Sequence, residues 1–145
     1  IAIFDSRASC SIISPSQYVE FVAPLHAKLI STIHEHGGQF TSLIIGGNTT
    51  PVLEHLFSAK PDMIVADFNI DATPFLTMAA NHNTMVKVNA NPAIFDSDIG
   101  WQEPLRDLCV MLKKYPRAIV STGIIPYGIP SHRLLAARDA IGSAI

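Results

Sequence analysis

Two acidic residues come directly after apolar runs of the kind that form buried strands. Asp5 follows residues 1–4, and Asp67 follows residues 63–66. A carboxylate at a strand end can bind an amine or hydroxyl of a substrate, or act as a general base. It can equally accept hydrogen bonds from the backbone of its own loop. Asp5 and Asp67 are therefore candidate catalytic residues, and the loop role stays open for both.

Neutral polar residues and glycines gather after the same apolar runs and after later ones. Amides and hydroxyls bind polar groups of a ligand, and glycine lets a ligand approach the backbone closely. The same residue types are typical of turns, so each of them also has a purely structural interpretation. The candidate substrate- or cofactor-binding residues are Ser6, Arg7, Gly47, Asn48, Thr49, Asn89, Asn91, Ser121, Thr122 and Gly123.

The elements that must position these residues alternate between strands and helices. Apolar runs predict strands at residues 1–4, 40–45, 63–66, 84–88 and 118–120. Capping residues and a spacing of three to four predict helices that follow them, at residues 15–36, 50–59, 71–80, 101–115 and 131–141. Repeated strand–helix units with short connections predict an α/β fold with a parallel sheet, in which these strand ends lie on one side.

The first helix has the clearest start. Ser14 and Gln17 form a capping box around Pro15, and Gly37 ends the helix. Pro24 should bend it locally. Seven apolar residues recur at helical spacing and predict one buried face, namely Tyr18, Phe21, Val22, Leu25, Leu29, Ile30 and Ile33.

Composition limits the fold and the partners. Hydrophobic residues make up 48% of the 145 residues, which suits strands that are buried on both faces. Two architectures fit, an open doubly wound sheet and part of a (β/α)8 barrel. No linker divides residues 1–145, so we expect a single domain. No apolar run approaches the roughly 18 residues of a membrane span.

Charge and cysteine content favour a small-molecule substrate in the cytoplasm. The formal net charge is −2 without a basic patch, so we expect no nucleic acid or membrane partner. Cys10 and Cys109 are far apart, which is typical of a reduced cytoplasmic protein. Cys10 lies in the loop after the first strand and could face the same site. None of the six histidines has a partner at metal-ligand spacing.

Several short motifs, in matching order along the chain, resemble the uroporphyrinogen decarboxylase superfamily. Residues 4–9 and 13–15 resemble the family's FDSWASG…LSP stretch, and Asp67 falls where the family has an Asp at a strand end. Residues 47–53 resemble the HxCGNTTPIL segment of its corrinoid-dependent branch, the methylcobamide:coenzyme M methyltransferases. Residues 89–92 resemble GN(L/V)DP, and residues 121–123 resemble STGC. The resemblance extends over essentially the whole chain.

This resemblance implies a fold larger than the chain. The family fold is a (β/α)8 barrel of roughly 250 residues or more. Five strand–helix units would form the C-terminal half of such a barrel. We therefore expect the rest of the barrel, or a partner chain, to cover the sheet edges that this half leaves open.

The resemblance also raises the question of a metal site. In the methyltransferase branch a zinc ion binds the acceptor thiol and lowers its pKa, and its ligands are the His and Cys of HxC and the Cys of STGC. The corresponding residues here are Ile44, Gly46 and Ile124, none of which can bind a metal. We therefore expect no zinc and no directly bound cofactor.

By resemblance, the chain is a corrinoid-dependent methyltransferase that lacks the zinc–thiol site. It would exchange a methyl group with a corrinoid carried by a separate protein. Two alternatives stay open. One is a uroporphyrinogen decarboxylase of porphyrin biosynthesis, a carboxy-lyase whose polycarboxylate substrate needs basic residues, of which Arg7 is the obvious one. The other is a barrel without catalysis that binds a ligand or a corrinoid protein.

Overall fold

The computed structural model describes residues 1–96 and 100–144, and the strands of this part form one parallel sheet. They lie side by side in the order of the sequence, and each neighbouring pair is parallel. A doubly wound sheet instead reverses its strand order at a switch point, so the sequential order selects the barrel segment. The strands are β1 (Ala2–Phe4), β2 (Ser42–Ile44), β3 (Met63–Ala66), β4 (Met85–Asn89) and β5 (Ala118–Ser121).

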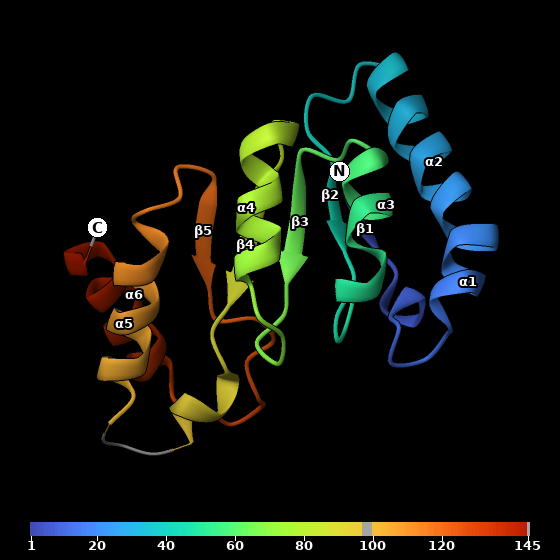
Figure 1. The fold of residues 1–145 in the computed structure, drawn as a ribbon. Coiled ribbons are helices and arrows are strands. Elements are labelled where there is room, and N and C mark those ends of the chain that lie inside the picture. Colours follow the sequence, from blue (N-terminus) through green and yellow to red (C-terminus); the bar gives the residue numbers. More distant parts are fainter. Residues whose placement is uncertain (97–99, 145) are drawn as a thin grey trace.

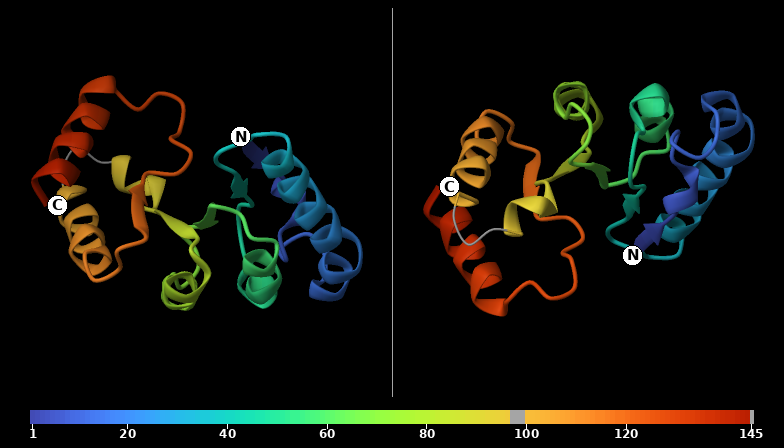
Figure 2. Two further views of the ribbon diagram at one scale, coloured as in Figure 1. Left: turned by 90° about the horizontal axis from the view of Figure 1, so that it is seen from above. Right: turned by 90° about the horizontal axis from the view of Figure 1, so that it is seen from below.

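The helices cover one face of this sheet (Figure 1). Seen along the strands they form an arc, and no described helix covers the opposite face, which we name the inner face (Figure 2). The α-helices are α1 (Pro15–Gln17), α2 (Ala23–Glu35), α3 (Leu53–Ser58), α4 (Thr73–His82), α5 (Gln102–Leu112) and α6 (Ser131–Ala144). A π-helix, η2 (Tyr18–Val22), joins α1 to α2, and 3₁₀-helices form η1 (Ser6–Ala8), η3 (Thr50–Val52) and η4 (Pro92–Phe95).

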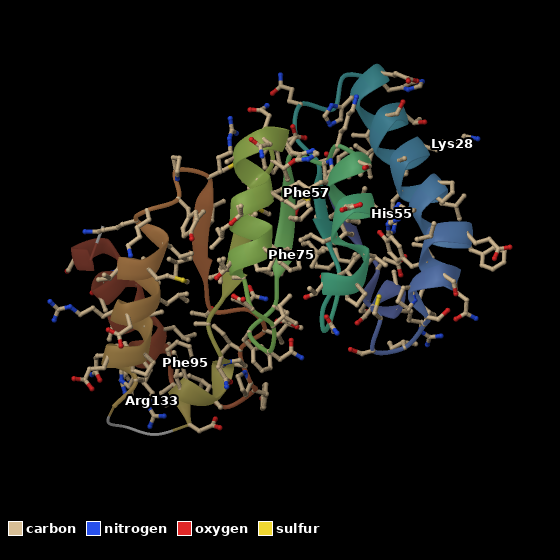
Figure 3. The ribbon with its side chains drawn as sticks, viewed as in Figure 1. Lys28, His55, Phe57, Phe75, Phe95 and Arg133 are labelled. Atoms are coloured by element: carbon tan, nitrogen blue, oxygen red, sulfur yellow. The ribbon has the colours of Figure 1, made fainter. Side chains whose placement is uncertain are left out.

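The hydrophobic core lies between the strands and the arc of helices. Leu43, Ile64 and Val86 are aligned across β2, β3 and β4, and all three are buried in one cluster. Phe57 of α3 and Phe75 of α4 are fully buried in the same cluster (Figure 3). Since alternate residues of a strand point to opposite faces, the residues between these core positions belong to the inner face.

The inner face carries a row of side chains across the five strands, and all but one of them are apolar. Phe4, Ile44, Val65, Lys87 and Ile119 occupy equivalent positions on successive strands. Phe4, on the edge strand β1, is 76% exposed. In a complete barrel such side chains fill the interior. The described part of the chain therefore presents an interior surface that lacks its opposite wall.

The predicted buried face of the first helix is wrong in part. The capping box of Ser14 and Gln17 is present, with hydrogen bonds in both directions. Pro24 cannot donate to the carbonyl of Glu20, and the π-helix η2 directly precedes it. The wider turn breaks the period of 3.6, so Phe21, Leu25 and Leu29 are 59%, 65% and 44% exposed. Tyr18, Ile30 and a residue absent from the prediction, His26, are the buried ones.

The amino end of the sheet is fastened by a polar cluster. The Asp62 carboxylate accepts hydrogen bonds from the Thr41 backbone N–H, at 2.7 Å, and from its hydroxyl, at 2.9 Å. His34 Nε2 lies 3.1 Å from the same carboxylate oxygen. Polar groups at this end of a barrel serve stability, because substrates bind at the other end. Among the described helices, none has the length and apolar character needed to cross a membrane.

The burial of Phe75 predicts a large loss of stability when its ring is removed. Phe75→Ala should lower the free energy of unfolding of the full-length protein by about 3–5 kcal/mol, because it leaves a cavity between α4 and the sheet. Asn81→Ala, at an exposed position of the same helix, is the matched control. Denaturant titration measures both. Equal midpoints for the two variants would contradict the placement of Phe75 in the core.

Candidate functional site

Asp67 lies at the carboxyl end of β3 and joins the loops that follow β2 and β3 to the last residue of β4. Its Oδ2 accepts a hydrogen bond from the Gly47 backbone N–H at 2.7 Å. Its Oδ1 accepts one from the Phe68 backbone N–H at 3.0 Å and one from the Asn89 side-chain amide at 3.1 Å. The carboxylate is therefore held in one orientation by three donors. Asp67, Gly47 and Asn89 are named here the Asp67 cluster.

The loop after β5 completes this cluster through Asn89. Gly123 has φ of +64°, and a Cβ atom added there would lie 3.2 Å from Asn89 Cγ. The Gly123 N–H donates to the Ser121 hydroxyl oxygen at 3.2 Å. Asn89 Oδ1 is buried and has no hydrogen-bond partner among the described residues. It is thus an acceptor at the centre of the site that a donor from outside this part of the chain can meet.

Gly47 also packs against the loop that follows β1. It has φ of +74°, and a Cβ atom there would lie 2.8 Å from Ser9 Oγ. The Cys10 N–H donates to the Asn48 carbonyl at 2.9 Å, and the Asn48 N–H donates to Ser11 Oγ at 3.2 Å. Only glycine has both the backbone freedom and the small size that this close approach requires.

Several candidate binding residues have local structural roles. Asn48 Oδ1 accepts from the Thr50 N–H at 3.1 Å, and Asn91 Oδ1 accepts from the Ala93 N–H at 3.0 Å. Both bonds are turn or cap contacts. The Thr49 side chain is buried, and its hydroxyl has no partner among the described residues. Of the other candidates, Ser6 and Arg7 are exposed in η1, and Thr122 is half-buried after β5.

The structure separates the two candidate catalytic acids. Asp5 Oδ2 lies 3.2 Å from His26 Nε2 of α2, and His26 Nδ1 lies 3.1 Å from the Tyr18 hydroxyl. Asp5 therefore bonds to the helix layer. Among the described residues, no hydrogen bond or ion pair joins it to Asp67. The Tyr18–His26–Asp5 chain links β1 to α2, and the sequence reasoning missed it; the spacing of eight residues between Tyr18 and His26 was the available signal.

Burial shifts the pKa values of His26 and Tyr18. It lowers the pKa of His26, and the hydrogen bond and charge of Asp5 oppose this effect in part. Burial raises the pKa of Tyr18, and the nearby Asp5 and Cys10 raise it further. A neutral His26 donates its Nε2–H to Asp5 and accepts from the Tyr18 hydroxyl at Nδ1. Burial also raises the pKa of Cys10, which keeps this thiol protonated and weakly nucleophilic.

The side chains present do not fit the zinc ion that the resemblance to the methyltransferase branch implies. In residues 1–96 and 100–144, no group of three or more His, Cys, Asp or Glu side chains could hold a metal ion. Ile44 lies on the inner face, and a Cβ atom added at Gly46 would lie 3.6 Å from Asp67 Oδ2. Ile124 is 91% exposed in the loop after β5. No chemical step is therefore assigned to zinc.

Comparison with known proteins gives a family and a fold. A family model described as uroporphyrinogen decarboxylase (URO-D) matches residues 1–94. A solved methyltransferase from Methanosarcina mazei superposes on 99% of this chain with a TM-score of 0.79 and 16% sequence identity. The match covers 41% of that methyltransferase, so the chain spans well under half of its length. A search of curated proteins found no match.

The hydrogen bonds of Asp67 predict a stability cost for an isosteric change. Asp67→Asn places an amide N–H₂ opposite one of the present donors, which should lower the free energy of unfolding by about 1–3 kcal/mol. Asp107→Asn, at an exposed position of α5, is the control. Chemical unfolding of the full-length protein measures the difference. An Asp67→Asn variant as stable as the control would show that the carboxylate does not hold these loops.

The lowered pKa of His26 predicts a pH dependence of stability. Below about pH 6.5 the unfolded chain takes up a proton on His26 that the folded chain excludes. The free energy of unfolding should therefore decrease as the pH is lowered. His26→Gln should reduce this slope, and His55→Gln, at an exposed position of α3 (Figure 3), is the matched control. Urea titrations at about pH 7 and about pH 5 measure the slope. An unaltered slope in His26→Gln would contradict a neutral buried His26.

Proposed function

The chain belongs to the uroporphyrinogen decarboxylase (URO-D) family, and on that premise we propose that it is part of a corrinoid-dependent methyltransferase. It transfers a methyl group to or from a corrinoid carried by a separate protein. The second substrate is a small molecule other than a zinc-bound thiol. The observation that carries this proposal is the polar site of backbone N–H, amide and carboxylate groups around Asp67 at the carboxyl ends of the strands.

The polarity of the site suits a corrinoid. A bound corrinoid supplies a methyl group on cobalt, and the rim of its ring carries amide side chains. Exposed amides of Asn48 and Asn91 at the strand ends are the residues suited to contact such a rim. Amide–amide hydrogen bonds need no net charge in the site.

Asp67 is suited to orientation rather than to proton shuttling. Its carboxylate already accepts three hydrogen bonds from the protein, which fix its position. Asn89 Oδ1 beside it is an acceptor with no partner in residues 1–96 and 100–144. Together they favour a substrate that presents an N–H or O–H group to the site.

The site is less suited to uroporphyrinogen decarboxylation. A polycarboxylate substrate requires several cations for recognition. On the strands, and in the described loops that follow their carboxyl ends, the basic residues are Arg7 in η1 and Lys87 on the inner face. A barrel that binds a corrinoid protein without catalysis remains the second alternative to methyl transfer.

Methyl transfer by the full-length protein tests the proposal. The assay follows the visible absorbance of methylcobalamin, or of a methylated corrinoid protein, in the presence of candidate acceptors. Asn89→Ala should raise KM by about tenfold, because the substrate loses a buried acceptor worth about 1.4 kcal/mol. Asn81→Ala, exposed on α4, should leave KM unchanged.

Three results would contradict the proposal. Turnover of uroporphyrinogen III without a cofactor, and without methyl transfer, would identify a decarboxylase. Tight binding of a methylated corrinoid protein without transfer to any acceptor would identify a non-catalytic barrel. Stoichiometric zinc in the purified protein would show that Ile44, Gly46 and Ile124 are wrongly assigned to the ligand positions.

A further inference from the structure

Lys87 is a charged residue in an otherwise apolar row. It lies in the middle of β4, between Val65 of β3 and Ile119 of β5 in the register of the sheet. Its strand neighbours Val86 and Val88 are buried in the core on the helix side. Lys87 therefore belongs to the inner face, two residues before Asn89 of the Asp67 cluster.

Lys87 has no partner in the described part of the chain. It is half-buried, and no hydrogen bond or ion pair joins it to residues 1–96 or 100–144. Val65, directly beside it, is 5% exposed, and Ile119 is half-buried. No described helix covers the inner face (Figure 2), and Lys87 is only half-buried, so its ammonium group can still reach water.

The structural comparison indicates that further strands and helices would cover the inner face in a longer protein. The chain superposes on 99% of its own length but on 41% of the M. mazei methyltransferase. In a closed barrel the inner face becomes the interior, and substrates enter at the carboxyl ends of the strands. An ammonium group enclosed there needs an opposite charge beside it, because an isolated buried charge is costly.

We propose that Lys87 binds an anionic oxygen group inside the completed barrel. A carboxylate or phosphate would meet the ammonium just below the Asp67 cluster. This group has two sources, a small-molecule substrate or an acidic side chain of the barrel segment that faces β4. In the first case Lys87 is a substrate-binding residue, and in the second it fastens the two halves of the barrel.

The experiment compares Lys87→Met and Lys87→Arg in the full-length protein. Lys28→Met is the matched control, because Lys28 is exposed on α2 and points away from the molecule (Figure 3). Acetate and inorganic phosphate are the probes, and calorimetric titration at low ionic strength gives their Kd. Thermal unfolding without added anion is measured between about pH 4 and about pH 8.

The two sources give different results. If the anion is a substrate group, the wild type and Lys87→Arg bind one of the probes, Lys87→Met weakens its binding about tenfold or more, and the Tm of Lys87→Met is unchanged. If the anion is a side chain of the barrel, Lys87→Met lowers the Tm near neutral pH. That loss shrinks as the pH falls through about 4, because the unpaired carboxylate takes up a proton.

One result would overturn the inference. It fails if Lys87→Met and Lys28→Met agree in anion affinity and in Tm over the whole pH range, because Lys87 would then be a solvated surface lysine. The inference depends on closure of the barrel and not on methyl transfer. A protein that binds phosphate through Lys87 but transfers no methyl group would keep this inference and lose the proposed function.

Discussion

The three hydrogen bonds accepted by the Asp67 carboxylate are the constraint on which the site depends. They fix the loops after β2 and β3 relative to the end of β4, and Asn89 of β4 also contacts Gly123 after β5. The close approach requires glycine at position 47, where any side chain would collide with Ser9. The turn at Gly47, the small size of this residue and the Asp67 carboxylate therefore depend on one another. Its consequence is a fixed, mostly neutral surface at the end of the sheet where barrel enzymes bind substrates.

Most of the fold follows from local patterns in the sequence. Apolar runs located the strands, and residues 63–66 were predicted with the bounds that β3 has. The order of the strands did not follow, because an open sheet and a barrel segment share the same alternation of strand and helix. The prediction of the buried face of α2 was wrong for a different reason. The π-helix before Pro24 changes the helical period, and a rule based on 3.6 residues per turn cannot carry across it.

The site was predictable where backbone position alone decides it. Residues that follow neighbouring parallel strands must lie close together, so Gly47, Asp67, Asn89 and Gly123 could be grouped from the sequence. Asp5 could not be separated from them in the same way. Whether its side chain faces the helices or the site depends on one residue of strand alternation, and its partner His26 lies 21 residues away on α2. Residue type could not reveal that contact, because a mid-helix histidine is usually without a specific role.

The central claim is that this member of the family transfers methyl groups without a zinc-bound thiol. The most direct test measures methyl transfer by the full-length protein before and after exhaustive chelation, with metal content determined on the same samples. Transfer that persists unchanged in zinc-free protein is the result this account predicts. Loss of transfer on chelation, with recovery when zinc alone is restored, would contradict it.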